Sequence, residues 1–190
     1  MADRARADTK LTYQDYLLFP DDGNRHEIID GDHYMSPSPS TDHQTVSRWI
    51  QFQLFEQIEK TGTGRVFNAP TAVELTETDV VEPDLVVVAW ARREIITRPR
   101  ILGIPDLLVE IISPQRPQYD RDLKFRLYQR TGVPEYWIVE TEARAVDRFR
   151  LGKGGTYAAA ERRTERIEFA SGAMGASVDL AQVWKAVAGL

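Results

Sequence analysis

Two apolar segments of the chain each carry a carboxylate that needs a partner. Asp84 opens the first segment, residues 81–88, and Glu110 lies inside the second, residues 105–114. A segment that is apolar on both faces predicts a β-strand covered on both sides, where an isolated carboxylate is strongly destabilising. The negative charge of Glu110 must therefore be compensated by an arginine, a proton or a metal ion.

A third acidic residue, Glu27, also adjoins an apolar strand segment. Carboxylates that come together raise one another's pKa, so a site with several ionised ones is normally held by a cation. Oxygen ligands select a hard divalent ion such as Mg²⁺ or Mn²⁺. A chain with three histidines and no cysteine is a poor ligand set for zinc. We therefore expect Glu27, Asp84 and Glu110 to bind Mg²⁺ or Mn²⁺ if the fold brings them together.

Lys124 follows Glu110 by fourteen residues and lies one turn into the next predicted helix. A lysine there could orient an attacking water or neutralise charge on a phosphate, as metal-assisted phosphodiester hydrolysis requires. The alternative is an exposed i,i+4 ion pair between Asp120 and Lys124, worth a few tenths of a kcal/mol. Spacing alone favours the ion pair.

Two further residues have a chemical and a structural interpretation. His43, in the first turn of a predicted helix, could approach a phosphate or act as an acid, but a solvated histidine is the commoner case. Tyr128 lies one turn beyond Lys124 and could hydrogen-bond into the site, but core packing with a satisfied hydroxyl is favoured. A capping box of Thr41 and Gln44 is expected to begin the helix of His43.

The elements that must position these residues alternate between helices and strands. We expect helices at residues 12–19, 41–60 and about 118–131, the last ended by Gly132, and a final helix that Asp179 caps. We also expect a hairpin at 26–35 that turns around Asp30 and Gly31, strands at 69–76, 81–88, 105–114 and 135–140, a second hairpin with strands at 143–151 and 156–160, and a weaker strand at 166–169 followed by a loose Gly/Ser stretch. This order predicts an α/β or α+β fold with a mixed sheet.

Composition limits the class of protein. The 190 residues suggest a polar tail at residues 1–10 and one domain at residues 11–190. No apolar run is long enough for a membrane span and the first ten residues are unlike a secretory signal, so we expect a cytoplasmic protein. The net charge of −5 argues weakly against a nucleic-acid partner, although residues 90–133 carry nine basic and five acidic side chains. That excess is equally consistent with a solvated helix face and a basic loop.

Five segments together resemble the Uma2 family, a group of bacterial proteins of unsettled function whose fold is similar to PD-(D/E)XK restriction endonucleases. They are EIIDG at residues 27–31, SPSP at 36–39 followed by His43, EPDL at 82–85, DLLVEIISP at 106–114 and GVPEYW at 132–137. The match runs in order from about Leu11 to Trp184. The resemblance implies a restriction-endonuclease-like mixed β-sheet flanked by helices, with additional antiparallel hairpins.

The resemblance also implies roles for individual residues. Asp84 matches the acidic residue of the PD element, Glu110 the second acidic residue, and Glu27 the upstream glutamate that often completes the metal site. The nuclease pattern expects lysine two positions after Glu110, where this chain has Ile112. In Uma2-like sequences the lysine moves to the following helix, and Lys124 occupies that place.

Three functions compete at this stage. The leading hypothesis is a Mg²⁺-dependent endonuclease acting on DNA, with Glu27, Asp84 and Glu110 on the metal and Lys124 assisting, and with a homodimer expected because nucleases of this fold often pair. The second is an inactive nuclease-fold module that binds nucleic acid or protein. The third is a structural domain in which the acidic residues are paired with arginines.

Overall fold

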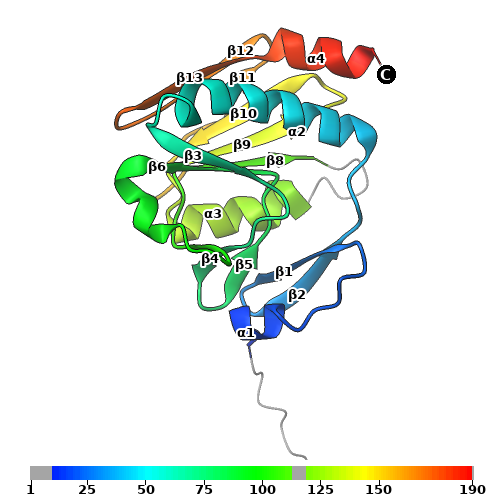
Figure 1. Ribbon diagram of the computed structural model, residues 1–190, viewed down its shortest axis with the longest axis vertical. Coiled ribbons are helices and arrows are strands. Elements are labelled where there is room, and N and C mark those ends of the chain that lie inside the picture. Colours follow the sequence, from blue (N-terminus) through cyan, green and yellow to red (C-terminus); the bar gives the residue numbers. More distant parts are fainter. Residues whose placement is uncertain (1–9, 113–118, 190) are drawn as a thin grey trace, which may run out of the picture.

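The computed structural model describes residues 10–112 and 119–189 (Figure 1). The predicted tail before Lys10 and the end of the second apolar segment, Ser113 and Pro114, lie outside the described residues. None of the described helices is long and apolar enough to cross a membrane.

A six-stranded mixed sheet forms the centre of the molecule. Its strands, in the order β11-β10-β9-β8-β6-β3, are Glu161–Arg163, Ala145–Arg150, Glu135–Glu140, Leu107–Ile111, Leu85–Ala89 and Gly64–Asn68. β8 and β9 are parallel, and the other neighbours are antiparallel. The two apolar segments therefore lie side by side as β6 and β8, as the chemistry of Asp84 and Glu110 requires.

A smaller sheet and a hairpin complete the β-structure. The small sheet has the order β2-β1-β5-β4-β7, with strands Asp32–Ser36, Arg25–Ile29, Asp79–Val81, Val73–Thr76 and Ile101–Leu102. The separate hairpin pairs β12 (Arg166–Ser171) with β13 (Met174–Asp179). β1 contributes Glu27, so this sheet supplies one acid of the predicted site.

The helices lie on both sides of the large sheet (Figure 1). They are α1 (Tyr13–Tyr16), α2 (Thr41–Leu54) with its π-helical continuation η1 (Phe55–Glu59), the 3₁₀ segment η2 (Trp90–Ile95), the π-helical turn η3 (Tyr119–Lys124) with its continuation α3 (Phe125–Thr131), and α4 (Leu180–Ala188). α2, α4 and the β12–β13 hairpin cover one face, and α3 and the small sheet cover the other.

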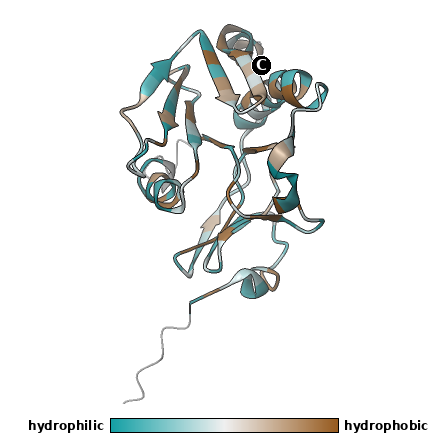
Figure 2. Ribbon diagram, turned by 90° about the vertical axis from the view of Figure 1, so that its left-hand side faces the viewer, coloured by the Kyte–Doolittle hydropathy of each residue, from teal (hydrophilic) through white to brown (hydrophobic). Residues whose placement is uncertain are grey.

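The two faces of the large sheet bury separate hydrophobic cores. Leu85 and Val87 of β6 pack with Ile50 of α2 on one face, while Val86 and Val88 pack with Tyr128 of α3 on the other. Successive strand residues point to opposite faces, which explains why β6 is apolar throughout and why β8 is apolar except at Glu110. Figure 2 shows hydrophobic residues concentrated on the strands and on one side of the helices. The predicted fold class is confirmed.

Two predicted turns have the expected backbone. Asp30 and Gly31 connect β1 and β2 with φ values of 52° and 78°, the left-handed pair that a two-residue hairpin needs. A side chain at Gly31 would also lie 2.5 Å from the Cβ of Lys10. Gly132 ends α3 with φ 85°, as predicted.

Several boundaries were predicted wrongly. Ser40, not Thr41 with Gln44, caps α2, and its side chain accepts a hydrogen bond from the His43 backbone. The expected helix at residues 12–19 is the four-residue α1, and the strand expected at residues 156–160 is β11, a few residues later. β3 was not predicted, and the loose stretch after residue 170 contains β13, which hydrogen-bonds along the full length of β12.

Candidate active site

The register of the central strands brings two of the predicted acids together. Leu85 pairs with Val109 across the antiparallel β6–β8 ladder, and one further step of the same register places Asp84 opposite Glu110. Residues directly opposite each other share a face of the sheet, with Cβ atoms about 5 Å apart. The Ile111 backbone N–H donates to Asp84 Oδ2 over 2.8 Å, which ties the two positions together.

Lys124 reaches this point from the other side of the core. Its Nζ lies 2.8 Å from Glu110 Oε1 and 2.9 Å from Glu27 Oε1, and the residue is 3% exposed. The alternative of an exposed ion pair at Lys124 is therefore wrong. Ile112, where the nuclease pattern has lysine, packs against the α3 side of the sheet. A lysine on the adjoining helix thus places its amine beside the second acid of the pattern.

Glu27 comes to the site through the small sheet. Its Oε1 accepts a hydrogen bond of 2.7 Å from the Glu82 backbone N–H, and the side chain is buried. Glu82 itself is a fourth acidic side chain, and its carboxylate accepts a hydrogen bond from the Tyr16 hydroxyl. Burial raises the pKa of Glu82, with a further contribution from the Glu27 charge, against the lowering effect of Tyr16.

Tyr128 is a core residue whose hydroxyl serves the site. It is fully buried and donates to Glu110 Oε1 over 2.7 Å. Burial, together with the negative charge of Glu110, raises its pKa well above the ordinary value, so the hydroxyl stays a donor. The prediction that Tyr128 packs in the core with a satisfied hydroxyl is confirmed. The partner of the hydroxyl is Glu110, one of the predicted site residues.

Asp84 is held by two side chains that sequence reasoning did not place there. Arg25 Nη1 lies 2.6 Å from Asp84 Oδ1, and His43 Nε2 lies 3.0 Å from Asp84 Oδ2. Burial opposes the charge on Asp84, but the His43 and Arg25 contacts outweigh it and hold the pKa of the carboxyl at about 2. The expectation that His43 is solvated was wrong, because it is 9% exposed.

Of the two partners of Asp84, only Arg25 could have been found from the sequence pattern. Arg25 stands two positions before Glu27 on β1, so strand alternation puts both on one face. His43 reaches Asp84 because Ser40 fixes the start of α2 next to the end of β6, which is a tertiary arrangement. Its Nδ1 is buried and has no hydrogen-bond partner among the described residues.

The carboxylates are the right ligands for a hard divalent ion, but side-chain cations neutralise them in this structure. Lys124 bridges Glu27 and Glu110, and Arg25 binds Asp84. In the part of the chain that the structure describes, no group of three or more acidic, histidine or cysteine residues has the spacing of a metal site. An ion at Asp84 and Glu110 would replace contacts that these cations make.

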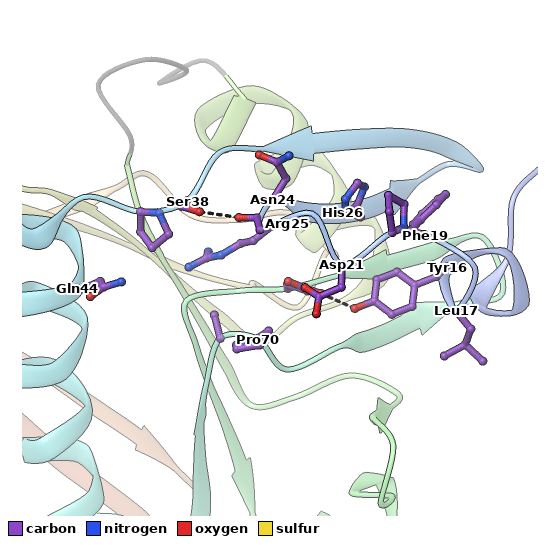
Figure 3. A pocket seen from close by; sticks show the side chains of 15 residues that line it. Tyr16, Leu17, Phe19, Asp21, Asn24, Arg25, His26, Ser38, Gln44 and Pro70 are labelled. Atoms are coloured by element: carbon purple, nitrogen blue, oxygen red, sulfur yellow. Dashed lines mark hydrogen bonds between the residues drawn. The ribbon is translucent and has the colours of Figure 1, made fainter.

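An open cleft adjoins the site (Figure 3). It has a volume of about 530 Å³ and lies between α1 with the loop that follows it, the start of β1, the first turn of α2 and the Ala69–Pro70 segment. Arg25 and Glu82 line it, so it reaches the guanidinium on Asp84 and the residue bonded to Glu27. Glu27, Asp84 and Glu110 themselves do not line the cleft.

Comparison with known proteins agrees with this architecture. The model of the Uma2 family, described as "Putative restriction endonuclease", matches residues 13–181. The chain belongs to the Uma2 family. A relative, the uncharacterized protein slr1290 of Synechocystis sp., is 25% identical over 175 residues, which are 90% of each chain.

A solved structure shares the fold. The crystal structure of a "putative nuclease belonging to DUF820" from Anabaena variabilis superposes with a TM-score of 0.75 at 16% identity and covers 93% of this Uma2 chain and 99% of its own. The predicted family is confirmed by the family model, and the predicted fold by this neighbour.

Proposed function

We propose that this Uma2 protein is a metal-dependent endonuclease that hydrolyses phosphodiester bonds of DNA. The observation that carries the proposal is the position of Lys124, whose Nζ lies within 3 Å of both Glu27 and Glu110. This chain has Ile112 where the nuclease pattern expects a lysine after Glu110, and Lys124 of the next helix would take the place of that lysine. A buried ammonium at this point can stabilise negative charge that develops on a phosphate.

The chain's residues would divide the work as follows. Asp84 and Glu110, with Glu27, would hold Mg²⁺ or Mn²⁺, which when bound polarises a phosphoryl oxygen and lowers the pKa of water. Lys124 would stabilise the attacked phosphate, and Tyr128 would fix the orientation of Glu110 through its hydrogen bond. Arg25 and His43 neutralise Asp84 in the metal-free protein, and bound metal would compete with them for this carboxylate.

The test is cleavage of supercoiled, linear and single-stranded DNA by purified protein with Mg²⁺ or Mn²⁺. Lys124→Met should lower the rate about 100-fold or more, the usual loss when one group that stabilises transition-state charge is removed. Lys60→Met, which removes an exposed lysine paired with Glu56, is the control and should cleave like wild type. Intact DNA together with no binding of either ion would refute the proposal.

One observation favours a second function, a nuclease-fold module that binds nucleic acid or protein without turnover. Each predicted metal ligand already has a cation from its own chain as partner. Salt-sensitive DNA binding that persists in Asp84→Asn, without cleavage by either protein, would support this function. A homodimer stays a prediction under both functions, and sedimentation equilibrium would test it.

A further inference from the structure

The cleft beside the site has Arg25 as its central cation. In Figure 3 the Arg25 side chain extends into the space between Gln44 of α2 and Pro70. Its Nη1 donates to Asp84, and this is the single hydrogen bond of the Arg25 side chain within the part of the chain that the structure describes. A guanidinium has five N–H donors, and this one is 21% exposed. Its remaining donors can bind the oxygens of a phosphate.

One wall of the cleft is aromatic and held in place. Tyr16 stacks on Tyr13 with ring centroids 5.7 Å apart, and its hydroxyl donates to Glu82. Phe19, further along the same wall, packs on His33 at 4.3 Å. Rings that are fixed by such contacts offer flat surfaces to a base at little entropic cost, and any base can stack on them.

The rest of the lining is unsuited to duplex DNA. Among the described residues, Arg25 is the one lysine or arginine that lines the cleft, and Asp21 and Glu82 line it as well. Duplex binding usually relies on several basic contacts along both strands, whereas a single strand needs a few cations and stacking surfaces. A cavity of about 530 Å³ is the size of a small-ligand site. These features suit one nucleotide unit without its pairing partner.

We propose that this cleft is a subsite for one unpaired nucleotide of a polynucleotide strand, with its phosphate on Arg25 and its base against the Tyr16 wall. The inference rests on the proposed nuclease function and specifies its substrate as single-stranded or locally unpaired DNA. Because Arg25 also binds Asp84, a phosphate on Arg25 weakens its hold on that carboxylate. Strand binding and the release of Asp84 for an ion are therefore coupled.

A matched pair of charge variants tests the phosphate contact. Gln44 and Thr41 are both exposed in the first turn of α2, but only Gln44 lines the cleft. Affinity for a fluorescent 12-nucleotide DNA strand is measured with EDTA present, so that no cleavage occurs. Gln44→Glu should weaken binding about fivefold through repulsion of the phosphate, and Thr41→Glu by less than about twofold. Equal losses of affinity in the two variants would refute the placement of the phosphate in the cleft.

A second pair tests the base contact. Tyr16→Ala should weaken binding of the same strand about fivefold or more. About fivefold is the lower end of the loss of affinity expected when one base-stacking ring is removed. Leu18→Ala, at an 81% exposed position outside the cleft, should leave affinity unchanged. A strand of abasic residues should bind equally to wild type and Tyr16→Ala. An abasic strand that binds wild type as well as the normal strand would overturn the proposal.

The two proposals can fail separately. Cleavage of DNA with Mg²⁺ that is indifferent to Gln44→Glu and Tyr16→Ala would leave the nuclease function standing and refute the subsite. Strand binding that depends on both residues, in a protein that never cleaves, would support the subsite and refute the nuclease. A duplex that binds more tightly than its separate strand would also refute the subsite.

Discussion

Asp84 shows most clearly how a buried charge is retained in this protein. It is 2% exposed, and its two oxygens are bound by Arg25, by His43 and by the backbone N–H of Ile111. Removal of one partner of a buried ion pair leaves the other charge unpaired in the interior, which is strongly destabilising. Asp84 therefore contributes to the stability of the metal-free protein.

Asp84→Asn should lower the free energy of unfolding by about 3 kcal/mol in the absence of divalent ions. Urea denaturation followed by tryptophan fluorescence measures the change, and Asp122→Asn, at an exposed position of η3, should stay within about 0.5 kcal/mol of wild type. A variant as stable as wild type would show that Asp84 is destabilised by its acidic neighbours. That result would favour an ion as its natural partner.

Two tyrosine hydroxyls in one aromatic cluster allow a direct comparison. Tyr128 donates to the carboxylate of Glu110, and Tyr157 donates to the backbone oxygen of Val133. A hydrogen bond to a charged group is worth about twice one to a neutral group. Tyr128→Phe should therefore cost about 2 kcal/mol of stability and Tyr157→Phe about 1 kcal/mol. Equal losses in urea denaturation would contradict an ionised Glu110.

At the scale of elements, α2 and its continuation η1 are attached to the edge of β13 by glutamine side chains that hydrogen-bond as a neighbouring strand would. The Gln57 amide donates to the Ser177 carbonyl and accepts from the Ser177 N–H, both at 2.9 Å. Gln53 makes the same pair of bonds to Asp179, at 3.3 and 2.7 Å. These bonds occupy a strand edge that would otherwise be exposed.

Gln57→Ala should destabilise the protein by about 2 kcal/mol, because it leaves both backbone groups of Ser177 without a partner. Gln51→Ala is the control, since Gln51 makes one exposed bond to Asn68, and it should change stability by less than about 0.5 kcal/mol. Hydrogen exchange at the Ser177 amide should accelerate in the first variant alone. Unchanged exchange there would mean that the glutamine is dispensable.

The same elements show what the sequence could predict. Strands with apolar residues on both faces, β6, β8 and β9, were predicted because burial on two sides leaves an unmistakable pattern. β13 was missed because Gly175, Ala176 and Ser177 have low strand propensity, and its stability comes from β12 and α2. The sequence singled out Glu27, Asp84, Glu110 and Lys124, whose roles stay predictions. The contact of His43 with Asp84 was not predicted, because it depends on how α2 meets β6.

At the scale of the whole molecule, most of the described basic side chains of residues 90–133 have partners within the chain. Five of the nine basic side chains of this segment are paired with carboxylates in the structure, namely Arg92, Arg100, Arg121, Lys124 and Arg130. A sixth, Arg93, lies over the ring of Trp90 with its guanidinium 5.2 Å from the ring centroid. With a net charge of −5, the chain as a whole is expected to repel a polyanion.

This charge distribution predicts a weak dependence of strand binding on salt. The logarithm of the affinity for a single strand falls with the logarithm of salt concentration by about 0.7 for each phosphate neutralised. If Arg25 makes the main phosphate contact, the slope between about 50 and 200 mM NaCl should lie near −1, and Gln44→Glu should lower the affinity without making the slope steeper. Fluorescence anisotropy of the 12-nucleotide strand measures both. A slope of about −4 or steeper would require a row of free cations, which contradicts the ion pairs observed and would move the binding surface away from the cleft.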